Sequence, residues 1–293
     1  MLLYIVLYKE IIKYIGVIIR IAFIILFERK ILSSLQERKG PTKIYFKGVL
    51  QPLSDFLKLF LKKNNYEGQG YFKSLILVIP FRLLIIFFLF WWVLPFNTRY
   101  NPNIVFFWFF LCLGFNIYPI IFSGWYTNCK YGYISCYRRL GQIISYELVL
   151  ILFIISIILI SKDLNIRNFY FISIFLPIIR VPLLLSILIE LNRTPFDFSE
   201  AERELVSGYI TEYGGFYFRF FFLSEYGIIL FFSILIRVIL YHEIYFIPVI
   251  ILLIIITRRI LPRSRYDKLI KIAWKVILPV GVCLRSTRYF LSI

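Results

Sequence analysis

The sequence contains eight long apolar runs, separated by more polar segments that hold most of its Lys and Arg residues. Each run approaches the roughly 20 residues that an α-helix needs to cross a bilayer. Hydrophobic residues make up 60% of the chain and charged residues 17%, which excludes an ordinary soluble domain. The pattern predicts an all-α polytopic membrane protein that forms a single integral-membrane domain over residues 1–293. The predicted spans are residues 4–27, 74–94, 104–124, 142–161, 170–190, 217–240, 246–260 and 269–290.

The chain is strongly basic, with a formal net charge of +18. In a soluble domain this charge would suggest nucleic acid, but here 21 of the 34 Lys and Arg residues lie in four loops between spans, at 28–73, 125–141, 192–216 and 258–271. The positive-inside rule predicts that these loops face the cytoplasm or the mitochondrial matrix and that both termini face outward. We therefore expect the basic residues to interact with membrane lipids, and we expect no nucleic-acid partner.

The chain offers few residues for a metal or redox centre. Cys112, Cys129, Cys136 and Cys283 form no CxxC pair, and His242 is the only histidine. Iron-sulfur clusters, structural zinc and haem normally need closely grouped Cys or His ligands. The sequence predicts no metal site and no redox centre in this chain.

The loop at 28–73 contains a short amphipathic segment. From Pro52 onward, Leu53, Phe56, Leu57 and Phe60 recur at helical spacing on one stripe. The predicted helix, residues 52–63, is too short to span and should lie along the interface with its apolar stripe in the acyl boundary. It could be a passive anchor, or it could frame an opening through which a lipid-soluble substrate leaves the bilayer.

The loop at 191–216 is acidic, and the stretch from Glu190 to Glu225 holds seven of the sixteen Asp and Glu residues. Thr194, Pro195 and Asp197 match a capping box, which predicts a helix that begins at Thr194. Asp197 could therefore be a capping residue or a functional one.

Three of these acids would share one stripe of that helix, because Asp197, Glu200 and Glu204 lie at i, i+3 and i+7. Carboxylates so close together should have raised pKa values if protein buries them, and coupled carboxylates suit proton storage and relay. A solvated acidic face is the alternative.

Glu147 lies inside an apolar run, with Arg138 and Arg139 upstream at the headgroup level. An intramembrane carboxylate is costly, so Glu147 is a functional candidate that should face protein or water. Glu28 and Glu225, at span ends, are weaker candidates that could simply anchor their helices at the interface.

Several motifs together resemble subunit 1 of NADH:ubiquinone oxidoreductase, the respiratory complex I. They occur in the order of that family and cover nearly the whole chain outside the lipid-facing runs. The matching stretches are ERKILSSLQERKGP, GVLQPLSDFLKLF, SGWYTNCKY, QIISYE, ELNRTPFDFSEAERELVSGYITEYGG, FFLSEY and LPRSRYDKLIKIAWKVILP.

The resemblance implies a core subunit of the mitochondrial inner membrane that walls a ubiquinone chamber and begins an acidic row for proton coupling. Ubiquinone would be the substrate, while the iron-sulfur clusters and FMN would belong to partner subunits. Implied partners are the iron-sulfur and quinone-site subunits of the hydrophilic arm, the small membrane subunits and accessory subunits. The resemblance assigns to the chamber Arg29, Asp55, Phe56, Arg193, Phe222 and Leu223. It assigns to the acidic row Glu147, Glu190, Asp197, Glu200, Glu202, Glu204, Glu212 and Glu225.

Two other classes of function remain open at this level. A proton-coupled secondary transporter would use the same acids, but it would predict an internal repeat with matched broken helices, and none is found. A membrane anchor for soluble subunits, such as that of a related membrane-bound hydrogenase, would need no coupled acidic row.

Overall fold

The computed structural model describes residues 2–42, 45–62, 73–93, 102–161, 177–197, 208–211, 213–240 and 245–291. Within these residues it is helical and has no strand, which confirms the predicted all-α class. The helices are α1 (Leu2–Leu35), α2 (Tyr45–Gly48), α3 (Gln51–Leu61), α4 (Lys73–Val93), α5 (Pro102–Tyr126), α6 (Lys130–Ser161), α8 (Pro177–Glu190), η3 (Gly208–Ile210), α10 (Gly215–Leu240), α11 (Phe246–Ile260), α12 (Tyr266–Ile272), η4 (Ala273–Ile277) and α13 (Leu278–Leu291).

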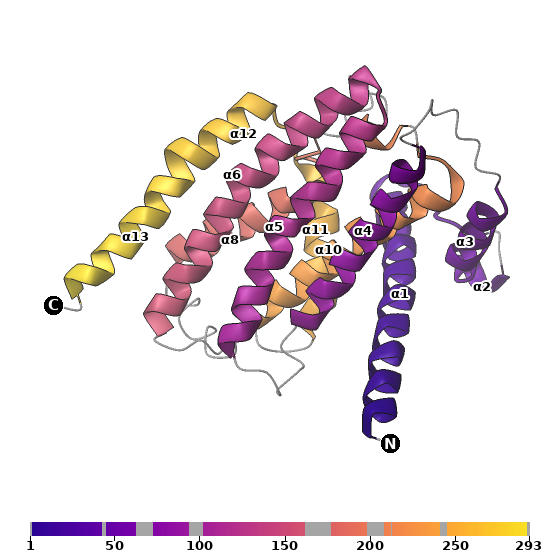
Figure 1. Cartoon of the computed structure of the whole chain (residues 1–293), viewed down its shortest axis with the longest axis horizontal. Helices are drawn as coiled ribbons and strands as arrows, with labels where there is room; N and C mark the ends of the chain where they lie inside the picture. Colours follow the sequence, from indigo (N-terminus) through magenta and orange to yellow (C-terminus); the bar gives the residue numbers. More distant parts are fainter. Residues whose placement is uncertain are drawn as a thin grey trace.

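The long helices stand side by side as a tilted bundle (Figure 1). In sequence order α4 packs on α5, α5 on α6 and α6 on α8, while α10 packs on α1, α4 and α11. Helix α1 stands at one edge of the bundle, and α12 with α13 forms the opposite edge against α6. The short helices α2 and α3 lie outside the bundle, beside the end of α1 that is far from the N-terminus.

Three described helices are long and apolar enough to cross a membrane, at Val105–Tyr126, Lys130–Leu159 and Gly215–Ile239, and Leu77–Trp92 is a shorter apolar helix. The other predicted spans also contain helix over the part that the structure describes. They differ from these three long apolar helices in composition or in length. Helix α1 carries Lys9, Glu10, Lys13, Arg20 and Glu28 within its apolar sequence, and α11 has only 15 residues.

Aromatic side chains fill the centre of the bundle, where α4, α5 and α10 meet. The ring of Phe231 (α10) lies 5.1 Å from that of Phe90 (α4) and 6.0 Å from that of Phe109 (α5). Gly227 lets α10 approach α4, because a Cβ atom at this position would lie 2.0 Å from the ring of Phe87. This packing sets the position of α10 along α4 and α5, and α10 carries three of the predicted site residues, Phe222, Leu223 and Glu225.

Helix α3 covers nearly the segment for which the apolar stripe predicts a surface helix. Leu53, Phe56 and Leu57 remain 58%, 41% and 61% exposed, so the described part of the chain leaves the stripe largely uncovered. Such a stripe suits the acyl boundary of a membrane.

Candidate functional site

Helix α3 is held against α1 and α10 by polar contacts. A guanidinium nitrogen of Arg29 (α1) lies 2.7 Å from a carboxylate oxygen of Asp55 (α3), whose other oxygen accepts a 2.9 Å hydrogen bond from Gln51. From α10, Arg219 donates a 3.0 Å hydrogen bond to the carbonyl oxygen of Phe56. The guanidinium of Arg219 also lies 5.1 Å from the centre of the Phe56 ring. Three of the six predicted chamber residues, Arg29, Asp55 and Phe56, therefore meet at one junction.

The other three predicted chamber residues lie along α10 or against it. One face of α10 carries four residues at positions i, i+3, i+4 and i+7, which are Arg219, Phe222, Leu223 and Tyr226. Arg193 lies over this face, with its guanidinium 4.4 Å from the ring centre of Tyr226 and 5.9 Å from that of Phe222. Two turns of α10, about 10 Å, thus separate the α3 junction from Arg193.

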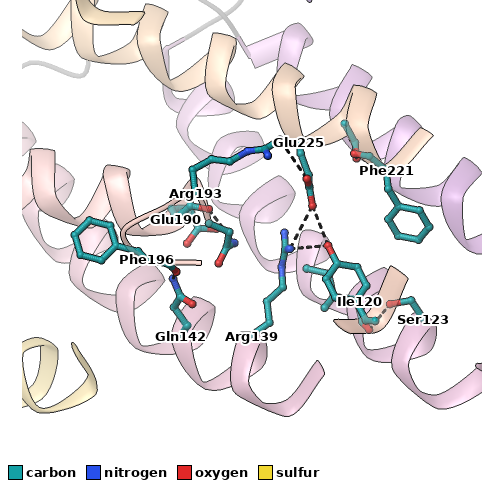
Figure 2. A network of polar contacts seen from close by, with 12 residues as sticks. Ile120, Ser123, Arg139, Gln142, Glu190, Arg193, Phe196, Phe221 and Glu225 are labelled. Carbon is teal, nitrogen blue, oxygen red and sulfur yellow. Dashed lines mark hydrogen bonds and ion pairs between the residues drawn. The ribbon is translucent and has the colours of Figure 1, made fainter. Parts of the chain in front are cut away.

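Glu225 is the centre of a buried charged cluster (Figure 2). Its side chain is 10% exposed, and its carboxylate oxygens lie 3.4 Å from Arg139 (α6) and 3.5 Å from Arg193. The hydroxyl of Tyr209, in η3, donates a 2.9 Å hydrogen bond to Glu225 and accepts one of 2.6 Å from Arg139. The alternative of simple interfacial anchoring does not describe this carboxylate, because it faces protein on several sides.

Glu190 is a second buried acid close to this cluster. It is 7% exposed, and within the described part of the chain its Oε2 atom has no hydrogen-bond partner. Gln142 (α6) holds the adjoining turn by donating to the carbonyl oxygens of Ile189 and Phe196, at 3.0 and 3.1 Å. The half-buried Glu147, also in α6, interacts electrostatically with Glu190. Burial of carboxylates with few partners is expensive and is common at functional sites.

The segment 191–197 forms turns, so the predicted helix beginning at Thr194 is wrong for these residues. The Thr194 hydroxyl oxygen accepts a 3.1 Å hydrogen bond from Arg258 (α11) instead of capping a helix. Asp197 faces Arg263, with 3.6 Å between a guanidinium nitrogen and a carboxylate oxygen. Contacts with the distant α11–α12 region have therefore replaced the local capping contacts that the sequence pattern favours.

Arg258 also forms an ion pair with Glu28, in the C-terminal part of α1. The Glu28 side chain is 9% exposed, so this acid too faces protein. Arg258 therefore connects α1 with the turns that precede the acidic segment.

Part of the predicted acidic row lies outside the described residues, and its arrangement stays a prediction. These positions are Glu200, Glu202, Glu204 and Glu212. Among the described residues, no three His, Cys, Asp or Glu side chains come together as a possible metal site.

Sequence reasoning missed two members of the Glu225 cluster. Arg139 was expected at the headgroup level, but it is only 5% exposed and its guanidinium lies 5.0 Å from the ring centre of Tyr209. Tyr209 is one of 22 tyrosines, and although it lies inside one of the matching stretches, the resemblance assigns it no role. The one signal that the sequence offered for Arg139 is that it precedes Glu147 by eight positions, about two turns of the same helix.

The fold and these contacts define a helical membrane protein with a cluster of charged groups buried among its helices. Comparison with known proteins identifies the class more closely, because residues 9–285 match the family model described as NADH dehydrogenase. The chain belongs to this family.

Its relatives share more than a third of their residues with it over most of their length. It is 39% identical to NADH-ubiquinone oxidoreductase chain 1 of Anopheles gambiae over 280 residues, which cover 91% of this chain and 89% of the relative. The protein of the same name from Apis mellifera ligustica is 37% identical, with 94% of each chain covered. That from Cyanidium caldarium is 35% identical, with 92% of this chain and 86% of the relative covered.

Proposed function

We propose that this chain lines the ubiquinone chamber of NADH:ubiquinone oxidoreductase and carries the first acids of its proton-coupling path. Membership of the family and the names of its relatives make the chain a core membrane subunit of that enzyme. The chamber consists of Arg29, Asp55, Phe56, Arg193, Phe222 and Leu223. The described acids of the path are Glu147, Glu190, Asp197 and Glu225, and Glu200, Glu202, Glu204 and Glu212 belong to it by resemblance.

The observation that carries this proposal is the shared face of α10. Arg219 contacts Phe56 at one end of this face, and Tyr226 contacts Arg193 at the other. Arg193 in turn lies 3.5 Å from the carboxylate of Glu225. Helix α3 and the carboxylate of Glu225 are thus joined through one helix, α10, and the guanidinium of Arg193.

This arrangement supports an electrostatic form of coupling. Partner subunits, which hold FMN and the iron-sulfur clusters, deliver electrons to ubiquinone in the chamber. Each reduction step adds negative charge, and in a poorly solvated site that charge acts strongly on nearby guanidinium and carboxyl groups. Arg193 would be drawn toward the reduced headgroup and away from Glu225, so that Glu225 takes up a proton and passes the change on to Glu190 and Glu147.

The same proposal fixes the place of the chain in the membrane. Four loops face the mitochondrial matrix, where the hydrophilic arm docks, and they are residues 28–73, 125–141, 192–216 and 258–271. The termini face the intermembrane space. The exposed stripe of α3 lies at the matrix-side interface and frames the opening to the lipid.

A photoreactive ubiquinone analogue tests the chamber assignment directly. In the assembled enzyme we expect light-dependent labelling within residues 28–62 or 190–225, mapped by peptide mass spectrometry. An excess of unmodified ubiquinone should abolish this labelling, because both ligands compete for one site. Labelling confined to the loops at 94–103, 162–169 or 241–245 would contradict the assignment.

A further inference from the structure

We infer that Tyr209 is a positioning residue, whose hydroxyl holds the carboxylate of Glu225 in place between the two arginines. The inference rests on the proposed role of Glu225 in proton coupling. Tyr209 was not among the residues that the motifs single out, and it enters through its contacts in the folded chain alone.

The direction of its hydrogen bonds follows from the chemistry of the partners. A guanidinium group can only donate, so the 2.6 Å contact makes the Tyr209 oxygen an acceptor from Arg139. The single hydroxyl proton then points at Glu225, whose Oε1 atom lies 2.9 Å away. The hydroxyl is also closer to the carboxylate than either guanidinium, at 3.4 and 3.5 Å. Tyr209 therefore makes the shortest of these three contacts and orients the carboxylate.

The surroundings of Tyr209 hold this hydroxyl in one position. The residue is 1% exposed, and its ring meets that of Phe221 edge to face at 5.8 Å. The Arg139 guanidinium lies 5.0 Å from its ring centre. All three residues of η3 are buried, and this short helix packs on α6 and α5. Rotation of the ring away from Glu225 would require the surrounding side chains to repack.

The place of Tyr209 in the chain gives this contact its importance. Tyr209 follows the segment that carries Glu200, Glu202 and Glu204, and it precedes Glu225 by 16 residues. Within the described residues, the hydroxyl of Tyr209 joins the short helix η3 to the carboxylate of Glu225 on α10. A displacement of η3 would therefore change the hydrogen bonding of Glu225.

Tyr209→Phe in the assembled enzyme tests the inference, because it removes the hydroxyl and keeps the ring. We expect ubiquinone reduction coupled to proton pumping to fall roughly tenfold per assembled enzyme, since the lost hydrogen bond involves a charged group. The KM for ubiquinone should not change. Tyr133→Phe is the control, since it removes a hydroxyl that bonds to Tyr137 on the exposed side of α6.

A double-mutant cycle separates positioning from a general loss of stability. If Tyr209 acts through Glu225, Tyr209→Phe should have no further effect on turnover in a Glu225→Gln enzyme. Independent effects that multiply in the double variant would overturn the inference, as would normal turnover of Tyr209→Phe. Normal turnover and pumping of Glu225→Gln would instead refute the proposed function itself. Blue-native gels of each variant show how much enzyme has assembled and so normalise every rate.

Discussion

Replacing Glu225 with Gln is expected to lower coupled ubiquinone reduction by roughly 10- to 100-fold per assembled enzyme. General acid–base groups contribute effects of this size or larger, and Gln retains the shape of Glu while losing the exchangeable proton. Because the carboxylate has two guanidinium groups and one hydroxyl around it, no neighbouring acid occupies the same position. The rates of NADH oxidation with ubiquinone and of proton uptake by proteoliposomes measure the effect.

Two controls define this result. Electron transfer from NADH to an artificial hydrophilic acceptor should be unchanged, because those electrons leave before the membrane subunit. Asp267→Asn should behave as wild type, since this carboxylate is 60% exposed and pairs with Arg265 at the surface. Full turnover of Glu225→Gln with ubiquinone would favour a passive membrane anchor over a coupling subunit.

Replacing Arg139 with Met is expected to reduce the amount of assembled enzyme sharply. The side chains of Arg139 and Glu225 are 6% and 10% exposed, and removal of one member of a buried ion pair costs about 3 kcal/mol or more. Tyr209 would lose its hydrogen-bond donor in the same step. Blue-native gels and thermal unfolding of the assembled enzyme measure the loss.

A second variant shows whether the loss of assembly in Arg139→Met comes from the carboxylate of Glu225, which has lost one of its guanidinium partners. Glu225→Gln should partly restore assembly of the Arg139→Met enzyme, because it removes the buried charge that has lost a partner. Lys130→Met, at the exposed start of the same helix, should assemble normally. An Arg139→Met enzyme that assembles as well as wild type would show that the cluster contributes little to the fold.

The sequence predicts the helices well because their signals are local. The spacing of Leu53, Phe56 and Leu57 predicts a surface helix, and one lies at Gln51–Leu61. The apolar runs likewise place both ends of α5 and α10 to within two residues, and they give the end of α6 at Ser161. The start of α6 was placed too late, because the helix begins at Lys130, 12 residues before the apolar run. Each of these predictions depends only on residues within a few turns of one another.

The capping prediction at Thr194 fails for the opposite reason. A Thr-Pro-x-Asp sequence favours a helix start when its polar groups have only local partners. Here Arg258, 64 residues away, binds the Thr194 hydroxyl, and Arg263 binds Asp197. Local patterns carry no information about such partners, because they depend on how α11 and α12 pack.

The charged cluster was predictable in part. Glu225 and Arg193 are recognised through their motifs, although their separation of 32 positions in the sequence hides their contact. Arg139 and Tyr209 join them only because α6 and η3 pack against α10 from distant parts of the chain. A tyrosine in a chain so rich in aromatic residues becomes a candidate only when its hydroxyl is seen beside a buried carboxylate.

The central claim is that quinone reduction changes the protonation of Glu225. Redox-induced infrared difference spectroscopy of the assembled enzyme observes this directly, because a protonated carboxyl group has a C=O stretching band that a carboxylate lacks. We predict that such a band appears on quinone reduction in wild-type and Asp267→Asn enzymes and is missing in Glu225→Gln. An identical band in all three enzymes would contradict the account.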